Sequence, residues 1–587
     1  MKRAVITGII FAAVLSVFLI MANYSGAIFE LPERTYSIEV HENGYADITE
    51  TVTYKMKKPF RYVTYAIDLP APMKIRNFKI DILQGPPVLG GISYDKKTEN
   101  SISTKILFSR SMEDYIPVTD NQIIKVAFKY TVENILIEGS DFTQLFIKYV
   151  GHGTVVRTKV LNVQVSFPLN FGEPLIYHHP WGLQFKSKEI ASNLYKFEFR
   201  NIPKDCFVEG RFVFPGLSQT GTDYFMKNLT LKDVKDLEAL YSRRVFLYVS
   251  GSITYVLLVL LIPIFIYRKL GRENPVAYDA EYERELPYKD LPELVNSVVK
   301  TICSLPGDDA IAAAVLDSVK KGDIQFVEDG NHQITGLRIL NPNSNRKTLF
   351  DAFRIFETDG VIDFKNVKKG LKNQRKAQDF LKKINQWRAE IKKNVDERKY
   401  LDSKGNVIAK TFAIIFGVII PLLSIVFLNR YYEPGFEIVN SYVSLLMILT
   451  SGIGLVIIAM RKDVFSRWSS EGLIYYLRWK NFEKFLRDFS LLSTYPPQSL
   501  AIWDDYIIYA TTLGIAREVI DNLKKLYPEP PATPVARTAY INPVIIHEIS
   551  SFRTIAASTV SSSSRGSGGS HGSGIGGGAG GSRVGAG

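Results

Sequence analysis

The chain has 587 residues, 46% of them hydrophobic, and a formal net charge of +13. This length ordinarily holds several domains, but long uncharged runs occupy part of it. The positive charge fits nucleic acid, an anionic membrane surface or the flanks of membrane helices, and most of the excess lies beside the uncharged runs. The two cysteines, Cys206 and Cys303, stand in no CxxC or histidine-paired spacing, so the pattern supports neither a zinc site nor a redox motif.

The first 27 residues have the pattern of an export segment. Lys2 and Arg3 precede an apolar stretch from Ala4 to Ala22, and small residues follow at positions 25–27. Such a segment is either a cleaved signal peptide or a retained N-terminal anchor. In both cases the residues that follow it are exported.

Three later runs have the length and composition of membrane spans. Residues 245–267 carry no charge and reach about 34 Å as a helix, which exceeds a hydrocarbon core of about 30 Å. Residues 411–428 and 441–460 are similar. The alternative, that these two runs are core helices of a soluble domain, fits their length and lack of charge less well.

The basic residues beside the spans predict the orientation. They form three clusters: Arg268, Lys269 and Arg272; Lys404 and Lys410; Arg461, Lys462 and Arg467. Because basic residues gather on the cytoplasmic side, we expect a multi-pass plasma-membrane protein with residues 268–410 and the C-terminus inside. The loop 429–440 is then outside, and the two cysteines lie on opposite sides of the membrane, where they cannot form a disulfide.

The expected exported region, residues 28–242, has the sequence pattern of an all-β domain. Tyr36, Ile38 and Val40 alternate with polar residues, Asn43-Gly44 follows, and Ile48 and Val52 resume the alternation. Asn-Gly between alternating runs is a strong hairpin signal. Further short apolar runs are separated by turn residues as far as Pro215, so an antiparallel sandwich is the simplest architecture.

Scattered polar residues of this region are candidates for catalytic or metal-binding groups. Glu50 shares a strand face with Ile48 and Val52, and we interpret it as a glutamate near a sheet edge that is solvated or paired with a basic neighbour. His152 and the His178-His179 pair have no carboxylate or thiolate at a diagnostic spacing. Together with Asp205 they show no nucleophile–base spacing, so we expect no catalytic, cofactor-binding or metal-ligating residues.

The segment 268–410 begins as a winged-helix-like α+β unit. A helix is expected near residues 291–303, a second from Ala310 to Lys321, and strands at 324–327 and 334–340. The second helix carries little positive charge before Lys320, whereas a recognition helix needs basic or amide side chains near its beginning. No nucleic-acid partner is therefore expected.

A basic amphipathic helix follows within residues 365–410. This stretch holds fifteen Lys or Arg against five Asp or Glu, with Phe380, Ile384, Trp387, Ile391 and Val395 at helical spacing. One interpretation places the basic face on anionic headgroups with Trp387 at the interface. The other packs the apolar stripe on the winged unit and leaves the basic face in solvent.

Residues 461–530 are expected to form a helical hairpin. Its helices run from Ser470 to Phe489 and from Ser499 to Leu526, separated by Tyr495-Pro496-Pro497. The aromatic residues of the first helix have the spacing of core packing, not of a cofactor site. Residues 531–587 end in Ser, Gly and Ala and are expected to be disordered, and their glycine runs follow no strand, so they are not phosphate loops.

The order of these parts resembles the predicted membrane proteins of the domain-of-unknown-function 2207 family. The resemblance covers most of the chain. It is carried by the strands around Asn43-Gly44 and Glu50, Val208-Glu209-Gly210-Arg211, Tyr267-Arg268-Lys269-Leu270-Gly271-Arg272, the residues Trp479, Phe482, Phe485, Leu486 and Asp488, then Trp503, Tyr509-Ala510 and Leu513-Gly514, and the glycine-rich end. The tail here is more often interrupted by Ser, Arg and His than is usual in the family. The resemblance implies an architecture and no catalytic signature.

These features favour a non-enzymatic adaptor or sensor that links an exported β domain to cytoplasmic domains. Its expected partners are the lipid bilayer and a membrane or envelope protein, and the oligomeric state is left open. One alternative is an envelope enzyme acting in the exported domain. The other is a subunit of an oligomeric transporter. The lack of charge in the spans speaks against this function. Three spans also seldom form a transport path alone.

Overall fold

A computed structural model describes residues 27–562 apart from 119–121, 192, 331–332, 432 and 489–501, together with Gly8, Phe11 and residues 583–586. Nearly all of the expected export segment lies outside the described residues, as does the turn expected at Tyr495-Pro496-Pro497. The chain divides into two compact units. Unit 1 comprises residues 1–262, 412–459 and 573–587, and unit 2 comprises residues 263–411 and 460–572.

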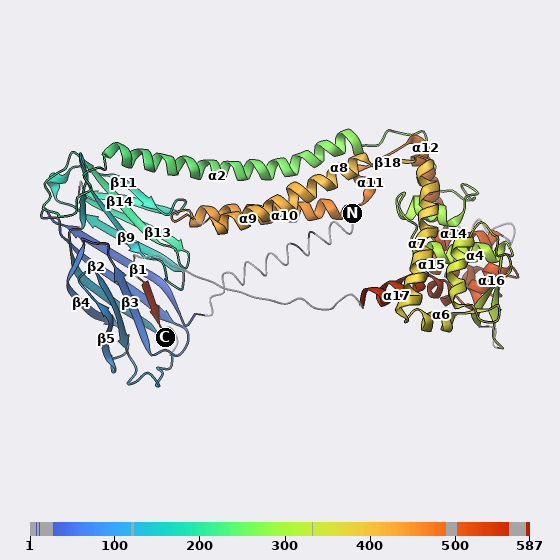
Figure 1. Ribbon diagram of the computed structural model, residues 1–587, viewed down its shortest axis with the longest axis horizontal. Coiled ribbons are helices and arrows are strands. Elements are labelled where there is room, and N and C mark those ends of the chain that lie inside the picture. The colour runs from blue at the N-terminus through green and yellow to red at the C-terminus, as the bar shows by residue number, and fades with distance from the viewer. Residues whose placement is uncertain are drawn as a thin grey trace. The chain divides into compact units, whose positions relative to one another are not determined.

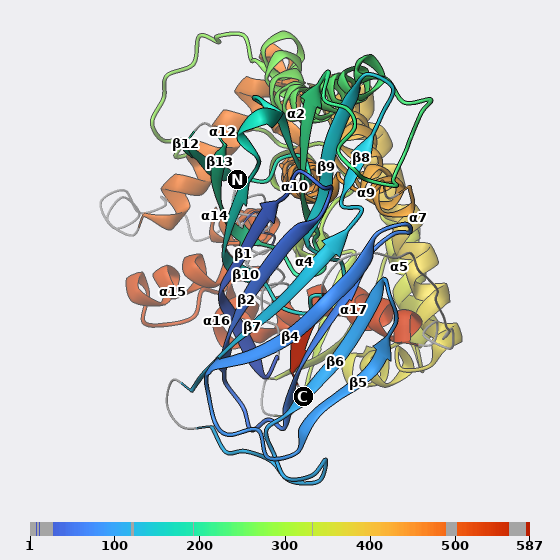
Figure 2. The same cartoon turned by 90° about the vertical axis from the view of Figure 1, so that its left-hand side faces the viewer.

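Unit 1 begins with a β-rich region of several sheets (Figure 2). The seven-stranded sheet has the order β12 (Phe185–Ala191), β13 (Leu194–Ile202), β10 (Thr158–Ser166), β1 (Phe29–Val40), β2 (Ala46–Met56), β7 (Ile123–Glu133), β4 (Lys74–Gln84). A four-stranded sheet has the order β11 (Leu175–His179), β14 (Val208–Pro215), β9 (Phe142–Val150), β8 (Leu136–Glu138). Another has the order β20 (Arg583–Ala586), β3 (Tyr62–Asp68), β6 (Ser101–Leu107), β5 (Gly91–Lys97). Side chains from all three sheets share one hydrophobic core.

The predicted hairpin is present. Strands β1 and β2 pair antiparallel, and Gly44 in the connection has a φ of 75°, which a glycine adopts without strain. The expectation of a wholly antiparallel arrangement is wrong, because β1 pairs parallel with β10, with Tyr36 opposite Val163. A parallel pair needs a long connection, and the strands between β2 and β10 supply it.

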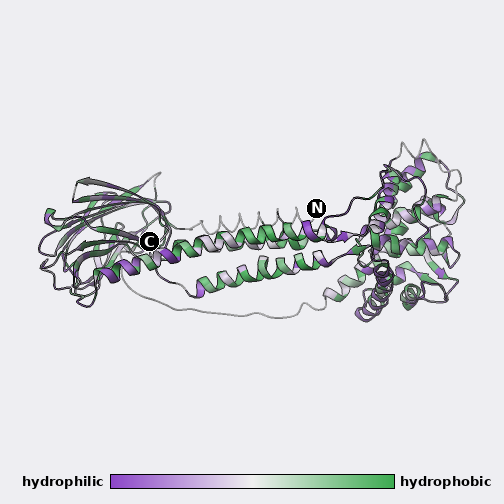
Figure 3. Ribbon diagram, turned by 90° about the horizontal axis from the view of Figure 1, so that it is seen from above, coloured by the Kyte–Doolittle hydropathy of each residue, from purple (hydrophilic) through white to green (hydrophobic). Residues whose placement is uncertain are grey.

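Three helices of the described residues are long and apolar enough to cross a membrane, as the sequence predicted (Figure 3). The first is α2 (Leu231–Ile266), which continues as a π-helical turn, Tyr267–Gly271. The second consists of α8 (Lys404–Phe412), a π-helical stretch (Ala413–Ile419) and α9 (Ile420–Arg430). The third is α10 (Glu437–Ala459).

Two glycines bring the second and third of these helices into backbone contact. A Cβ atom on Gly417 would lie 2.6 Å from the Cα atom of Gly454, and one on Gly454 would lie 2.7 Å from the carbonyl carbon of Gly417. Small residues allow this close approach where lipid supplies no hydrophobic driving force between helices. The pair therefore fixes how these two helices pack.

Unit 2 is mainly helical. Its elements are α3 (Pro292–Val295) with a π-helical turn (Asn296–Lys300), α4 (Asp308–Lys320), β15 (Ile324–Glu328), β16 (Ile334–Ile339), α5 (Lys347–Phe353), β17 (Ile362–Asp363), α6 (Phe364–Gly370), α7 (Gln374–Glu397), β18 (Leu401–Asp402), α11 (Lys462–Phe465), β19 (Arg467–Trp468), α12 (Ser470–Arg487), α14 (Ile502–Leu513), α15 (Ala516–Leu526), α16 (Pro534–Ile541) and α17 (Val544–Ser562). One core contains side chains from nearly all of them. The segments predicted as a winged-helix-like unit and as a helical hairpin therefore share one core.

Helix α4 lies at the centre of unit 2. Every residue from Ala310 to Ser318 is buried, and α14 and α17 both pack on this helix. A recognition helix must expose one face to a groove of the DNA. Helix α4 exposes none over these residues.

The apolar stripe of α7 is also buried. Phe380 and Ile384 are fully buried and Trp387 is 2% exposed, and the helix packs on α5 and α17. The ring centroid of Phe380 lies 5.9 Å from that of Phe353 in α5. The placement of Trp387 at a membrane interface is therefore wrong, because packing inside unit 2 already removes its ring from water. Contact of the exposed lysines of α7 with lipid headgroups stays a prediction.

The disordered tail expected from residue 531 begins later than the sequence suggested. Helices α16 and α17 occupy much of residues 534–562, and α17 buries Ile549, Phe552 and Ala556 in the core of unit 2. The chain also ends in strand β20, which pairs with β3 of unit 1 (Figure 1). Residues 563–582 lie outside the described residues.

Candidate functional site

Glu50 belongs to a buried polar cluster of the β-rich region. The Arg34 guanidinium donates to the Glu50 carboxylate through Nε at 3.1 Å and also through Nη2, and the Tyr65 hydroxyl donates to Oε2 at 3.0 Å. The hydroxyls of Tyr36 and Tyr130 lie 3.0 Å apart beside them. The predicted basic partner is present, but the predicted sheet edge is wrong, because β1 and β7 flank β2 on both sides.

His152 and Asp205 lie together in a pair of turns, away from strand interiors. The Nδ1 atom of His152 lies 3.0 Å from the backbone oxygen of Asp205, and the Asp205 carboxylate accepts a hydrogen bond from the Gly153 amide at 2.6 Å. These bonds join the two turns to each other. Each involves a backbone group, and the Nδ1 atom of His152 also lies 4.0 Å from Oδ1 of Asp205.

The adjacent histidines of β11 have opposite environments. The ring of His178 is surrounded by aromatic rings, with the centroid of Phe197 at 4.4 Å and that of Phe199 at 5.2 Å. Burial lowers the pKa of the His178 imidazole from 6.5 to about 4. This side chain is therefore neutral at pH 7 and belongs to the aromatic core.

His179 lies between two carboxylates. Its Nδ1 atom is 3.1 Å from Oε1 of Glu209 in β14, and its Nε2 atom is 3.1 Å from Oε2 of Glu238 in α2. Arg211 donates to the other Glu238 oxygen at 2.8 Å. All four side chains are buried. We call these residues the α2 anchor, because they fix the beginning of α2 to the four-stranded sheet.

The α2 anchor holds His179 in its charged form. Burial opposes the charge, but the hydrogen bonds with Glu209 and Glu238 outweigh it and raise the pKa of His179 from 6.5 to about 9. An imidazolium that donates to two carboxylates satisfies both ring nitrogens. Electrostatics therefore join α2 to the sheet at neutral pH.

The α2 anchor should weaken in alkaline solution. Because the pKa of His179 is raised in the folded state, its contribution of about 3 kcal/mol is complete below pH 6.5 and is lost as the pH rises through about 9. We expect the protection factors of amides in the first turns of α2, which are exchange rates corrected for the intrinsic base catalysis, to fall over this range. His179→Asn should abolish this fall, and His152→Asn, at a half-exposed turn, should leave it intact. Wild-type protection factors that stay constant from pH 6.5 to 10 contradict this assignment.

The connection between α9 and α10 packs beside the α2 anchor. The Trp181 amide donates to the Gly435 oxygen at 2.9 Å, and the ring of Tyr241 in α2 lies 5.8 Å from that of Phe436. Arg244 of α2 donates to Glu433 at 3.2 Å. The loop predicted at residues 429–440 is thus held by the β-rich region and by α2.

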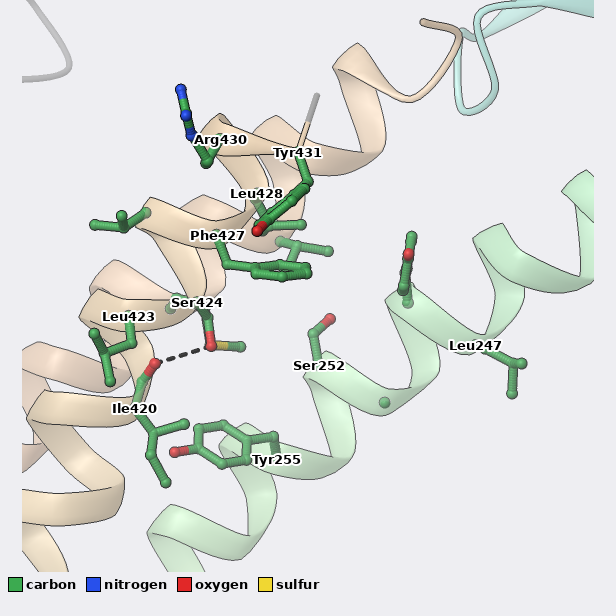
Figure 4. Close-up of a pocket in the computed structure, with 15 residues that line it drawn as sticks. Leu247, Ser252, Tyr255, Ile420, Leu423, Ser424, Phe427, Leu428, Arg430 and Tyr431 are labelled. Carbon is green, nitrogen blue, oxygen red and sulfur yellow. Dashed lines mark hydrogen bonds between the residues drawn. The ribbon is translucent and has the colours of Figure 1, made fainter. Parts of the chain in front are cut away.

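A cavity of about 810 Å³ lies between α2 and α9 (Figure 4). Three of its hydroxyl groups donate to backbone carbonyls: Ser252 to Val249 at 2.8 Å, Ser424 to Ile420 at 2.9 Å and Tyr255 to Phe416 at 2.6 Å. Among its lining residues only Arg430, at one end, carries a charge. Its remaining surface is aliphatic and aromatic, which suits lipid chains better than an ion or a polar substrate.

In unit 2 the turn that follows α2 and the beginning of the second long helix are held to α11 by close backbone contacts. A Cβ atom on Gly271 would lie 2.7 Å from the Val464 oxygen, and one on Gly405 would meet the Phe465 oxygen and the Leu270 side chain. Arg467 donates to the backbone oxygens of Arg272 and Lys269. We call these contacts the glycine junction.

Two features of these sites escaped the sequence analysis. Glu209 and Glu238 were not weighed as partners of His179, because they lie 30 and 59 residues away along the chain. Glu238 lies in the first turns of α2, and no local sequence pattern marks it as buried. Within the described residues, no three His, Cys, Asp or Glu side chains are grouped so that they could hold a metal ion.

Similarity to solved structures is limited. An M1 zinc metallopeptidase from Deinococcus radiodurans matches at 9% identity with a TM-score of 0.20, over 31% of this chain and 42% of that one. A putative protease from Parabacteroides distasonis matches at 8% identity with a TM-score of 0.18, over 32% of this chain and 40% of that one. The chain thus spans less than half of either protein. No curated protein matches it.

Two family models match the chain in the order of its parts. The predicted membrane protein (DUF2207) N-terminal domain matches residues 30–214, which hold the β-rich region and most of the α2 anchor. The predicted membrane protein (DUF2207) C-terminal domain matches residues 279–523, which hold most of unit 2 and two of the three long apolar helices. Together these matches cover most of the chain, which therefore belongs to the DUF2207 family of predicted membrane proteins.

Proposed function

We propose that this chain is a non-enzymatic adaptor or sensor of the plasma membrane. Its sandwich-like N-terminal domain is exported. Unit 2, with its winged-helix-like segment and helical hairpin, lies in the cytoplasm together with the C-terminus. A partner bound outside biases unit 2 through the membrane helices.

The observation that carries this proposal is the continuity of α2. Its beginning is fixed to the β-rich region by Glu238, and the turn that follows it, Tyr267–Gly271, is fixed by the glycine junction of unit 2. The boundary between the two units falls inside this helix, at Ile262 and Pro263. A continuous helix held at both ends can carry a displacement from one domain to the other.

The basic residues beside the spans support the orientation. Arg268, Lys269 and Lys462 stand beside the ends that belong to unit 2, and Arg467 donates to backbone oxygens there. In the connection Asn429–Asn440 a single arginine is accompanied by Glu433 and Glu437. This asymmetry supports a cytoplasmic position for unit 2.

The two other functions have less support. An envelope enzyme needs convergent polar groups with a nucleophile and a base, whereas Glu50 is bound by Arg34 and Tyr65 and His152 is bound to a backbone oxygen. A transporter subunit needs polar groups along a path, whereas the hydroxyls of Ser252, Tyr255 and Ser424 in the cavity between α2 and α9 bond to backbone carbonyls.

Thiol labelling tests the orientation. Cys206 and Cys303 are both free and buried, so an impermeant reagent should label neither in the native protein. We expect Lys227→Cys, at an exposed position before α2, to be labelled on intact cells. Lys382→Cys, at an exposed position of α7, should be labelled only after lysis. Labelling of Lys382→Cys on intact cells would overturn the orientation.

Hydrogen exchange of the full-length protein in lipid nanodiscs tests the coupling. Glu238→Gln weakens the hold on His179 and Arg211 by about 1–3 kcal/mol. If α2 couples the domains, exchange should also accelerate in residues 267–272 and 462–468. Asp236→Asn, at an exposed position of the same helix, is the matched control and should change neither segment. Changes confined to residues 175–240 would contradict the coupling.

Affinity purification tests the adaptor role itself. We expect the same partner proteins to be recovered from membranes in independent preparations, and Glu238→Gln to leave their recovery unchanged if they bind the exported domain. Preparations that share no protein would count against the adaptor role.

A further inference from the structure

The edge of strand β3 is covered by a short strand from the far end of the chain. Residues 583–586 form β20, which pairs antiparallel with β3: Val584 lies opposite Tyr65, Gly585 opposite Thr64 and Ala586 opposite Val63. On its other side β3 pairs with β6. Strand β20 therefore occupies an edge that would otherwise present a row of unpaired backbone groups.

The added strand also buries side chains. Val584 is 2% exposed and belongs to the hydrophobic core of the β-rich region, and Ala586 packs against the same core. They lie on the face of the sheet that carries Val63 and Tyr65, both fully buried. Alternate residues of a strand share one face. The two side chains of β20 that pack on the core are therefore a β-branched one, Val584, and a small one two positions later, Ala586.

Tyr65, the residue of β3 that lies opposite Val584, belongs to the buried polar cluster around Glu50. The ring of Tyr65 stacks on that of Phe128 with centroids 3.8 Å apart, and its hydroxyl donates to Glu50 at 3.0 Å. These contacts fix the Tyr65 ring by residues of β2 and β7 and not by β20. The receiving surface is therefore formed by residues that belong to the core itself.

In the proposed orientation the chain's own end cannot reach this edge. Three spans after an exported domain return the chain to the cytoplasm, and residues 563–582 consist mostly of Gly and Ser, with no apolar run that could span a bilayer. The same holds for the end of a second copy. An occupant of the edge has to come from the exported side.

We propose that the edge of β3 is an acceptor site for an extended segment of an exported partner protein. The segment carries a β-branched residue and, two positions later, a small residue, as Val584 and Ala586 do. Backbone hydrogen bonds to β3 supply affinity, and the two buried side chains supply selectivity. This inference deepens the proposed function and rests on its orientation, since it names the class of partner that the exported domain receives.

Peptide binding tests the site directly. The protein is truncated after residue 582, purified in detergent and titrated with a fluorescent peptide of residues 580–587, Gly-Gly-Ser-Arg-Val-Gly-Ala-Gly. We expect saturable binding, weakened at least about tenfold when Val584 of the peptide is replaced by Asp, because the carboxylate would be buried. Absent binding, or equal binding of the two peptides, would overturn the proposal. Since this assay measures no coupling, it can succeed even if the adaptor role fails.

Disulfide trapping tests the register. A peptide with Cys in place of Gly585 should cross-link to the variant Thr64→Cys, because directly opposite residues of antiparallel strands lie within disulfide range. The matched control is Ala66→Cys, which lies on the same face of β3 but opposite Arg583. The native cysteines are buried and should not compete. Equal trapping by both variants would contradict a defined strand register.

Vesicles distinguish a partner from the chain's own end. Full-length and truncated proteins are reconstituted, and only molecules with the N-terminal domain outward are exposed to the peptide. If the full-length and the truncated protein bind the peptide with equal affinity, the edge of β3 is vacant in the full-length protein, which supports the proposal. At least tenfold weaker binding by the full-length protein would show that its own end covers β3, and would overturn both the partner and the orientation.

Discussion

Replacing Trp387 by alanine should lower the free energy of unfolding of unit 2 by about 3–5 kcal/mol. The indole is 2% exposed in the stripe of α7 that packs on α5 and α17. Its removal leaves a cavity among elements that are distant in sequence and cannot easily collapse. The free energy is measured from hydrogen exchange of the slowest amides of unit 2 in the full-length protein.

The control for this substitution is Lys382→Ala on the same helix, where the side chain is exposed. It should change the free energy by less than about 0.5 kcal/mol. A Trp387→Ala variant within about 1 kcal/mol of the wild type would mean that the stripe does not pack in the core. A role of Trp387 at the lipid interface would then be open again.

Replacing Glu50 by alanine should destabilise the β-rich region by about 3–5 kcal/mol, because Arg34 would keep a buried charge without its carboxylate. Both side chains are fully buried. Exchange of the amides of β1 and β2 in the full-length protein reports the loss. Glu39→Ala, at an exposed position of β1, should have little effect.

A double variant separates the ion pair from the packing around it. Replacing both partners, Arg34→Met with Glu50→Leu, removes the unpaired charge and should recover most of the stability that Glu50→Ala loses. If the double variant is as unstable as the single one, the cluster holds the sheet by its shape and not by its charge balance.

Local patterns were sufficient to predict the elements whose causes are local. The hairpin of β1 and β2 follows from alternation around Asn43-Gly44, and the three apolar helices follow from uncharged runs of spanning length. Helix α17 was missed because its serines and threonines resemble a disordered tail. Ile545, Ile549, Phe552 and Ala556 nevertheless stand at helical spacing within it, and this spacing could have identified it.

The candidate sites depend on contacts that no local pattern encodes. His179 meets Glu209 because β11 pairs with β14, and it meets Glu238 because α2 begins beside that sheet. Glu50 is central because β7 flanks β2, a pairing across some 80 residues of chain. Periodicity predicts which face of an element is buried. It does not identify the partner that covers this face.

Helix α2 has a fixed rotation about its axis relative to its neighbours in unit 1. Glu238 contacts the sheet and Tyr255 donates to the Phe416 oxygen of the second long helix, so two directions around the same helix axis are specified. Each added residue turns one of them by about 100° relative to the other, and about seven or eleven residues must be added before the two directions agree again to within about 20°. The exposed residues between these two contacts can therefore vary in identity, while their number is fixed by geometry.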